Sequence, residues 1–524
     1  MGGSDLRQRA AVTLLRNIQN RRVLARHPLV ELQAPGRQTE FVDRLPAIVT
    51  GLVAELAAES APQARRFAAL RKSDLEGKSH TAIAREMGLS RSQFYRDLRD
   101  ARECFAEALE ARLAVRKRSA NGGKFYARDV RFIAIEALCD GGRSVQAEQL
   151  ARSLASDSDD AATAVRALCF AAKLQTELGS FAVAGSTMMR ARSLVPRVAE
   201  DRIRGLLEST CDLAAIEVAH CRGVPASDEA RNLLLERLRY GYTQRDPAYA
   251  ATLVEALMEE SSTLFERDDA VRAQTLIGEA SSIVTRESLE QTRLGVDVEI
   301  RASGIRALTP DRVSVALNAT ADIVDLGNRT GDAWMLRVGM QMMAAHLLTL
   351  GRTDEARHFA LEAWALIDLF GSTLDRLIVL SNLARIEIHR RDGHQALKWI
   401  EMAQALECDA FSISQALEIS RAEAFVLIGQ ADSGAKLAHC SSDRVRRWAR
   451  LRARAKLAEA TALYSLNRAA EARTASTEAV ELSRGSAGPL LHLRALDLNV
   501  KLTGSSTSRA ELRDLQAALN ASVG

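Results

Sequence analysis

The stretch LGRTDEARHFALEAWAL, from Leu350 to Leu366, carries the pattern that decides the fold. A turn at Gly351 separates two apolar stretches, and Ala356 follows early in the second one. The small side chain of an alanine lets two helices approach closely where they cross, and a glycine reverses the chain without steric strain. The stretch therefore predicts the turn and the second helix of a helical hairpin.

The same pattern recurs from about residue 128 onward, most clearly in Leu178–Pro196, Arg390–Leu406 and Leu466–Leu482. The first small residue of each predicted second helix falls at Ala147, Ala184, Ala273, Ala316, Ala356, Ala396, Ala435 and Ala472. Most of these neighbours are 37 to 43 residues apart, and the double gap after Ala184 leaves room for a degenerate unit near Ala230. A period of this length is typical of stacked helical hairpins.

The hairpin Leu178–Pro196 resembles the tetratricopeptide repeat. The residues in the relative places of the consensus are Gly179, Phe181, Ala184, Ala191 and Pro196. The resemblance implies an α-solenoid over residues 128–515, whose concave face binds a peptide, a partner protein or a small ligand. Composition agrees with an all-α fold, since the 524 residues include only nine prolines and long Ala, Leu, Arg and Glu stretches.

A second pattern precedes the repeats, in HTAIAREMGLSRSQFYRDLRDAR from His80 to Arg102. Gly88 is a predicted helix end, because glycine readily takes the left-handed conformation. Ser79 and Ser90 are predicted N-caps of two successive helices, with Gln93 completing a capping box on the second. The apolar positions have helical spacing on both sides of the turn: Ile83, Ala84, Met87, Phe94, Leu98, Ala101 and Phe105. The pattern predicts a helix-turn-helix.

The opposite face of the second predicted helix is polar and cationic, and consists of Arg91, Ser92, Gln93, Tyr95, Arg96 and Arg99. Arginine and glutamine can pair bidentately with base edges in the major groove of DNA. The predicted DNA-binding set also includes the flanking residues Lys72, Lys78, Ser79, His80 and Arg102, placed to contact the phosphate backbone. The alternative is a three-helix bundle that only packs or contacts protein.

The motif resembles the helix-turn-helix of sigma-70 region 4 and of LuxR-related response regulators. The matching residues are Leu75–Ser79, Ile83, Ala84, Met87–Ser90, Phe94 and Leu98–Arg102. Phe94 stands where a smaller aliphatic residue is usual, and His80–Ala82 lack the common acidic residue. The resemblance implies that the second helix enters the major groove with Arg91, Ser92, Gln93, Tyr95 and Arg96 toward the bases.

Charge is unevenly distributed along the chain. Residues 1–128 contain 24 Lys and Arg against 14 Asp and Glu, a net charge of +10, so the rest carries −6 of the total of +4. A basic head points to a polyanionic partner such as double-stranded DNA. The predicted organisation is a helical region at 1–60 with helices around 5–24 and 41–58, a helix-turn-helix domain at 61–118, a hinge at 119–127 and the array at 128–515.

Several classes of function are not expected. The seven cysteines are scattered and form no CxxC, which is typical of a reduced, cytoplasmic protein. Cys211, His220 and Cys221 fit no common zinc spacing, so neither a metal nor another cofactor is expected. No catalytic motif stands out, so the chain is not expected to be an enzyme. No apolar stretch reaches the roughly 20 residues of a membrane span.

One arginine-rich stretch lies within the repeats, at Asp443–Lys456. It either docks an acidic partner or DNA, or forms a solvated face with an arginine against Trp448. We expect the solvated face, because long arginine side chains commonly cover apolar surface while their heads stay in water.

These patterns predict a DNA-binding transcriptional regulator whose repeat array senses a ligand or binds a partner protein. A single head binds DNA weakly, so a second copy of the chain or RNA polymerase is expected to add affinity. The alternative is a non-enzymatic scaffold. In that case the repeats bind a protein, and the head contacts RNA polymerase or another protein.

Overall fold

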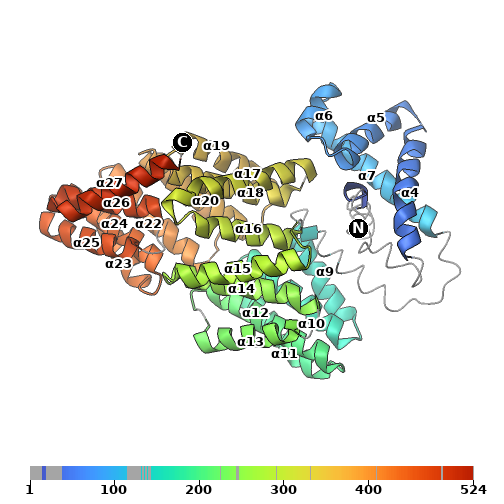
Figure 1. The fold of residues 1–524 in the computed structure, drawn as a ribbon, viewed down its shortest axis with the longest axis horizontal. Coiled ribbons are helices and arrows are strands. Elements are labelled where there is room, and N and C mark those ends of the chain that lie inside the picture. The colour runs from blue at the N-terminus through green and yellow to red at the C-terminus, as the bar shows by residue number, and fades with distance from the viewer. Residues whose placement is uncertain are drawn as a thin grey trace. The chain divides into compact units, whose positions relative to one another are not determined.

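The computed structural model describes residues 14–18, 38–58, 60–114 and 143–522, apart from residues 225, 244–246, 291, 331, 409 and 485–487, with four single positions between 132 and 139. All regular structure in these described residues is helical (Figure 1). The chain forms two compact units, Met1–Leu154 with Asp325–Trp334, and Ala155–Val324 with Met335–Gly524. We call them the N-terminal unit and the repeat unit. The predicted hinge at 119–127 lies outside the described residues.

The N-terminal unit includes α4 (Gln38–Ala58), α5 (Ala61–Leu70), the π-helical turn η1 (Arg71–Leu75), α6 (His80–Glu86) and α7 (Arg91–Ala114). Their apolar side chains share one core, in which Phe67, Phe94 and Phe105 are at most 1% exposed. Val49 and Leu52 of α4 belong to the same core. The predicted helix at 41–58 is therefore confirmed, and it packs with α5–α7. Most of the predicted helix at 5–24 lies outside the described residues.

The turn between α6 and α7 follows the sequence pattern closely. Ser79 accepts a hydrogen bond from the backbone N–H of Ala82, and Ser90 accepts one from that of Gln93. Gly88 has a φ of +64°, the left-handed conformation that its predicted role requires. The predicted capping box is only half formed, because the Gln93 amide donates to Asp97 at 2.9 Å. Two successive helices with a glycine turn are thus present where the sequence predicts them.

Helical hairpins make up the repeat unit and the end of the N-terminal unit. The first helices of the hairpins are α10 (Ala161–Glu177), α12 (Asp201–Cys221), α14 (Pro247–Glu266), α16 (Arg293–Arg306), α18 (Ala333–Thr349), α20 (Thr373–His389), α22 (Phe411–Leu427), α24 (Ala449–Ser465) and α26 (Pro489–Thr503). The second helices are α9 (Ser144–Asp157), α11 (Phe181–Leu194), α13 (Asp228–Thr243), α15 (Ala270–Arg286), α17 (Val313–Thr330), α19 (Thr353–Phe370), α21 (Gly393–Gln404), α23 (Ala431–Arg444), α25 (Ala469–Ser483) and α27 (Ser506–Ala521). None of the described helices is both long and apolar enough to cross a membrane.

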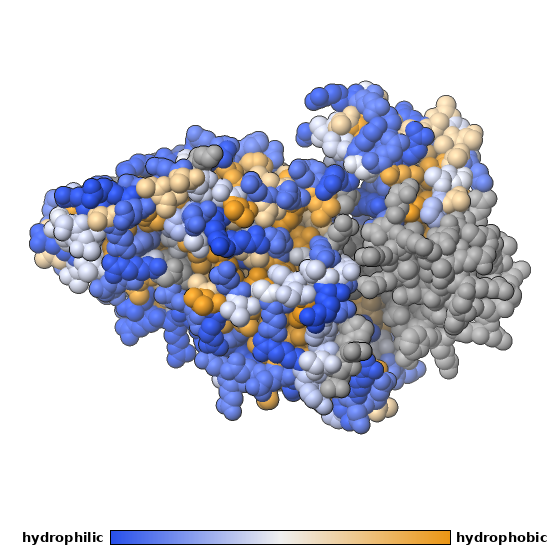
Figure 2. Space-filling model, viewed as in Figure 1, coloured by the Kyte–Doolittle hydropathy of each residue, from blue (hydrophilic) through white to orange (hydrophobic). Residues whose placement is uncertain are grey.

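The predicted small residues lie where the helices of each hairpin cross. All eight are in the first turns of second helices and are at most 7% exposed: Ala147, Ala184, Ala273, Ala316, Ala356, Ala396, Ala435 and Ala472. Gly179 and Gly351 occupy the turns before two of these helices, with φ values of +78° and +75°. The visible face of the hairpins is mostly hydrophilic, with hydrophobic residues showing mainly between helices (Figure 2). The tetratricopeptide-like hairpin pattern is therefore confirmed.

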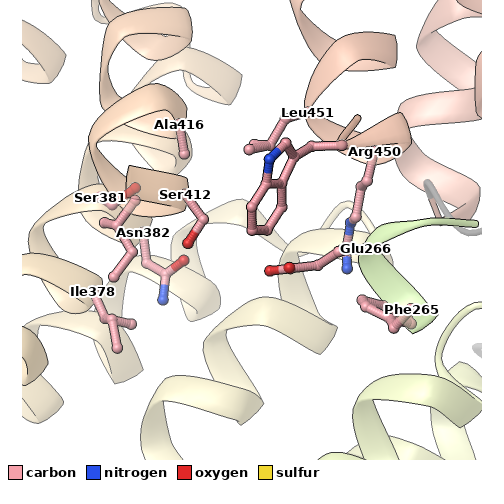
Figure 3. Close-up of a pocket in the computed structure, with 11 residues that line it drawn as sticks. Phe265, Glu266, Ile378, Ser381, Asn382, Ser412, Ala416, Arg450 and Leu451 are labelled. Atoms are coloured by element: carbon pink, nitrogen blue, oxygen red, sulfur yellow. The ribbon is translucent and has the colours of Figure 1, made fainter. Parts of the chain in front are cut away.

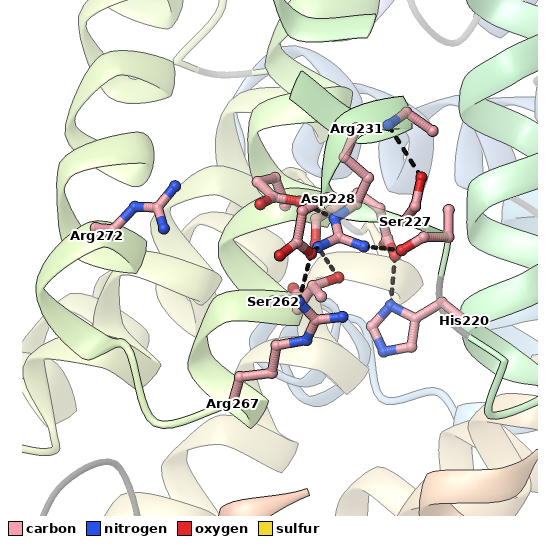
Figure 4. A network of polar contacts seen from close by, with 12 residues as sticks. His220, Ser227, Asp228, Arg231, Ser262, Arg267 and Arg272 are labelled. Carbon is pink, nitrogen blue, oxygen red and sulfur yellow. Dashed lines mark hydrogen bonds and ion pairs between the residues drawn. The ribbon is translucent and has the colours of Figure 1, made fainter. Parts of the chain in front are cut away.

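The hairpin of α12 and α13 is the degenerate unit predicted near Ala230. Arg231 occupies the position that the other second helices give to alanine, and it is only 3% exposed. Its guanidinium pairs with Glu260 of α14 and with Asp228, which also takes Arg267 (Figure 4). A buried ion pair replaces the small side chain here, so the pattern of small residues is lost although the hairpin is kept.

The repeat unit curves back on itself. Ser522, which follows α27, accepts a hydrogen bond of 3.1 Å from the backbone N–H of Ser314. Ser314 comes directly after the short helix η4 (Pro310–Arg312) and Val313. Leu490 of α26 likewise packs against the buried cluster that contains Leu347 of α18 and Leu383 of α20. The array therefore curves back so that α27 meets η4 and the start of α17.

Candidate functional site

The outward surface of α7 is the first candidate site. Arg91, Ser92, Tyr95 and Arg96 are exposed, on the side opposite the buried Phe94 and Leu98. We call these four exposed residues the α7 face. Tyr95 is 53% exposed, which is high for a large aromatic side chain. Neither Arg91 nor Arg96 has an ion-pair partner among the described residues. The face therefore offers two guanidinium groups and an aromatic ring to a partner.

Two of the predicted phosphate contacts are occupied inside the unit. Lys72 pairs with Glu86 at 2.6 Å, and its side chain is only 18% exposed. His80 lies 3.0 Å from the Ser73 hydroxyl, and its ring packs against Phe94 with centroids 5.3 Å apart. Burial, aided by nearby Arg102, lowers the pKa of His80 to about 4. His80 is thus neutral near pH 7, and its contact with Phe94 joins the two positions that depart from the sigma-like pattern.

Arg102 is also held internally. Its guanidinium donates to both carboxylate oxygens of Asp74, at 2.7 and 2.8 Å, and Arg16 donates to the same carboxylate at 3.1 Å. Burial alone would raise the pKa of Asp74, but Arg102 and Arg16 outweigh it and lower that pKa to about 2. Arg102 is therefore engaged inside the unit, and its role as a phosphate contact stays a prediction. A buried carboxylate without a counter-charge would destabilise the fold strongly, so Asp74 keeps the guanidinium of Arg102.

The remaining predicted residues of the head divide between capping and surface roles. Ser79 caps α6, and the Gln93 side chain is tied to Asp97. Lys78 and Arg99 are exposed, but they have acidic neighbours, Glu76 at 3.3 Å and Asp100 at 3.2 Å. The burial of Asp74 and Asp97 could not be predicted from the sequence, because the spacing of a buried aspartate does not differ from that of an exposed one.

The second candidate site is a cavity of about 550 Å³ in the repeat unit. Its walls come from seven consecutive first helices, α14, α16, α18, α20, α22, α24 and α26, and from residues next to them. The second helices contribute none of the described lining residues. The hairpin repeat thus places one face of each first helix from α14 to α26 toward a common space. The volume falls within the range of about 300–1,000 Å³ that is usual for ligand pockets.

Arginine dominates the charge of this cavity. The lining residues include one acid, Glu266, and five arginines: Arg301, Arg385, Arg450, Arg454 and Arg494. His346 and His389 also line it, and burial lowers their pKa values to about 4 and about 3. Both histidines are therefore neutral near pH 7. The positive charge of the cavity comes from its guanidinium groups.

Two of the five arginines are neutralised by a buried acid behind the cavity wall. Glu423 of α22 takes Arg454 at 2.7 Å and Arg494 at 2.9 Å. Burial alone would raise the pKa of Glu423, but these two arginines lower it to about 2. Arg301 also has partners within the chain. It pairs with Asp297, one turn earlier on the same helix, at 3.8 Å, and donates a hydrogen bond to the Ser262 hydroxyl.

Arg385 and Arg450 have no ion-pair partner among the described residues. The Nε of Arg385 is buried and makes no hydrogen bond within the described chain. Burial, together with Arg454 and Arg450, lowers the pKa of Arg385 to about 9. Arg450 lies over the Phe265 ring at 4.7 Å, and the adjacent Glu266 takes a hydrogen bond of 2.8 Å from His220. Two guanidinium groups thus line the cavity without an ion pair among the described residues, although Glu266 lies near Arg450.

A recess of about 230 Å³ adjoins the cavity and shares Arg450 with it. Figure 3 shows Arg450 beside Glu266 and Phe265, with Ser381 and Asn382 across the recess. Arg450 and Arg454 belong to the run Asp443–Lys456, for which a solvated face was the expectation. That expectation is wrong for these two residues, which line the cavity. Their spacing of four residues places them on one helix face, the only sequence signal that could have found them.

The cysteine and histidine residues considered as metal ligands have other contacts. Cys211 lies with its Sγ 3.6 Å from that of Cys169. His220 lies between Glu259 and Glu266, which outweigh the effect of burial and raise its pKa to about 10. No cluster of three potential metal ligands occurs within the described ranges.

No family model and no curated protein matches this sequence. Among solved structures, a Rap protein complexed with Competence and Sporulation Factor is 13% identical, with 68% of this chain and 99% of that one covered and a TM-score of 0.43. Yeast Tom70 is 13% identical over 80% of this chain and 94% of its own, with a TM-score of 0.35. The APC/C subunits Cut9–Hcn1 are 12% identical over 90% and 99%, with a TM-score of 0.30. TM-scores this low establish no shared family, so the repeat assignment depends on the hairpins themselves.

Proposed function

We propose that this chain is a non-enzymatic binding protein whose repeat unit receives a peptide segment of a partner protein in the cavity. The observation that carries the proposal is the common wall. Seven first helices present apolar and cationic side chains to one shared cavity, and two arginines there make no ion pair among the described residues. Buried or half-buried cations without partners are costly to fold, which favours a binding role over a structural one.

Filling the cavity tests this proposal. Gly304 of α16 lines the cavity, and a Cβ there would meet only the Met342 side chain, at 3.6 Å. Gly304→Phe should therefore fold and occupy the binding space. Gly278→Phe on the outer helix α15 is the matched control, because nothing lies within 4 Å of a Cβ at that position.

The experiment is quantitative crosslinking of the tagged full chain in its native cells, followed by mass spectrometry. A partner that binds in the cavity is lost from Gly304→Phe and retained by the wild type and by Gly278→Phe. Its purified form must then protect the first helices from hydrogen exchange. If both glycine variants retain the same partners at wild-type levels, the cavity is not the binding site.

A second function, DNA-binding transcriptional regulation, is favoured by the α7 face. Arg91 and Arg96 are exposed and unpaired within the described chain, and Tyr95 stands between them on the same side. Such a face matches the arginine contacts through which a helix reads guanine in the major groove. Regulation then links a partner in the repeat unit to a DNA-binding head, in a cytoplasmic protein that binds as a homodimer or beside RNA polymerase.

Binding of the full chain to a random duplex pool at several salt concentrations tests this second function. Arg91→Ala and Arg96→Ala should each remove preference among the selected sequences, at a cost of about 1–3 kcal/mol. Lys78→Ala should weaken all duplexes alike and make the salt dependence shallower. If the chain shows no salt-sensitive duplex binding but binds RNA polymerase through the α7 face, the scaffold alternative is correct for the head.

A further inference from the structure

We propose that the cavity of the repeat unit recognises an acidic peptide segment, with one carboxylate on Arg385 and another on Arg450. This inference rests on the proposed function and gives the partner segment its chemistry. Each guanidinium offers a planar fork of donors that matches a carboxylate in two parallel hydrogen bonds. The segment therefore carries two acidic side chains, or one acidic side chain and a free C-terminus.

The neighbouring arginines show what such a pairing provides in this site. Arg454 donates to Glu423 at 2.7 and 3.1 Å and to the Ser420 hydroxyl at 2.7 Å. Arg494 donates to the other oxygen of Glu423 at 2.9 Å. Among the described residues, Glu423 makes ion pairs with both of these cations. Arg385 and Arg450 make none within that part of the chain, and only the longer-range attraction of Glu423 and Glu266 acts on them. A ligand with carboxylates completes the pairing that the protein leaves open.

Repulsion among the cations favours the same conclusion. Arg385 is close enough to Arg454, Arg450 and Arg494 for each of them to lower its pKa. Arg454 also lowers the pKa of Arg450. Like charges in a partly desolvated space raise the free energy of the empty site. A bound carboxylate relieves this repulsion, so part of the binding free energy is set by the arrangement of the empty cavity.

The distribution of the arginines favours a peptide over a single small anion. Arg385 is on α20 and Arg450 is on α24, so their guanidinium groups approach the space from separate helices. A single phosphate would be matched best by groups that converge on one point. The wall also has apolar side chains, next to polar ones such as Gln341, Ser381 and Asn382: Ile300, Ile305, Leu308, Ile378, Leu451 and Leu490. This mixture suits a segment that alternates acidic and apolar side chains.

The test uses two pools of synthetic pentapeptides and the immobilised full chain. In the first pool Asp or Glu alternates with Leu, Ile or Val, and in the second Asn or Gln replaces every acid. All peptides have an acetylated N-terminus and an amidated C-terminus. Retained peptides are quantified by mass spectrometry, and the dissociation constants of the strongest ones are measured by calorimetry at low and high salt.

The acidic pool should be retained at least about tenfold better than the amide pool, because a charge-assisted hydrogen bond contributes more than a neutral one. Arg385→Gln and Arg450→Gln should each weaken the selected acidic peptides about tenfold or more. Arg473→Gln, an exposed arginine on the outer helix α25, is the matched control and should bind as the wild type does. Thermal unfolding of each variant verifies that it folds, and the two cavity arginines are tested separately.

Three results would overturn the inference. Equal retention of both pools means that carboxylates are not recognised. Wild-type binding by both cavity variants means that these arginines are not the contacts. Displacement of the acidic peptides by equimolar inorganic phosphate assigns the cavity to a small oxyanion instead. These results are distinct from a failure of the proposed function. That function fails only if Gly304→Phe leaves partner binding unchanged.

Discussion

The core of the head and the wall of the cavity differ in how their arginines are paired. In the N-terminal unit, Arg102 and Arg16 meet on the carboxylate of Asp74, and Arg65 donates to Asp97 at 3.0 Å. In the repeat unit, Arg385 and Arg450 line a cavity and make no ion pair among the described residues, whereas Arg454 and Arg494 pair with Glu423. The same side chain therefore stabilises the fold where the chain supplies its acid, and under our proposal it binds a partner's carboxylate where the chain does not.

The largest effect is expected where an internal acid is removed from the head. Asp74→Ala leaves Arg102 and Arg16 without a counter-charge and should lower the free energy of unfolding of the N-terminal unit by about 3–5 kcal/mol. Asp100→Ala is the control, because Asp100 is 28% exposed and pairs with the exposed Arg99. That change should cost no more than about 1 kcal/mol.

Chemical denaturation followed by hydrogen exchange of α5–α7 measures both variants. If Asp74→Ala lowers the free energy of unfolding by less than about 1 kcal/mol, the ion pairs of Arg102 and Arg16 with Asp74 do not stabilise the head. The contrast between head and cavity would then have no energetic basis.

Acid should also weaken the pairing inside the head. The folded-state pKa of Asp74 is about 2, below its ordinary 3.8, so its contribution to stability is full above pH 4 and is lost as pH falls toward 2. A shift of this size corresponds to roughly 2 kcal/mol. Unfolding of the head, followed at α5–α7 between pH 5 and 2, should show this loss. Asp74→Asn should flatten the profile over the same range, whereas an unchanged profile would contradict the pairing.

The sequence predicted the repeats well because their signal is local. Ala356 and its counterparts lie one turn inside each second helix, and Gly351 marks the turn before it, so spacing alone locates the hairpins. Arg231 shows where that reasoning stops, since its position can be recognised only when Glu260 is seen opposite it. Either a small alanine or a buried ion pair can fill the position where the two helices cross. Only the alanine produces a pattern that can be recognised in the sequence.

The candidate sites were harder to predict than the fold because they depend on contacts distant in sequence. The exposed positions Arg91, Tyr95 and Arg96 follow from helical periodicity around Phe94. The internal roles of His80 and Arg102 do not, because they depend on η1 folding against α6 and α7. The cavity depends on the return of α27 to the turn before α17, through Ser522 and Ser314. Because the sequence does not show this long-range contact, it predicts that Arg450 and Arg454 lie on a solvated helix.

The smallest expected effect compares two arginines within the cavity. Arg454→Gln removes a partner of Glu423 and should lower the free energy of unfolding of the repeat unit by about 1–3 kcal/mol. Arg385→Gln removes a cation that the described chain does not pair, so stability should stay unchanged or rise by up to about 1 kcal/mol. Chemical denaturation monitored at Trp364 and Trp399 reports on both, since these side chains pack in the repeat core. Equal destabilisation by the two changes would mean that Arg385 has an internal structural partner, and that its place in the cavity wall serves the fold. If Arg454→Gln lowers the free energy of unfolding and Arg385→Gln raises it, the charge of Arg385 destabilises the empty repeat unit. A bound acid would then offset that cost.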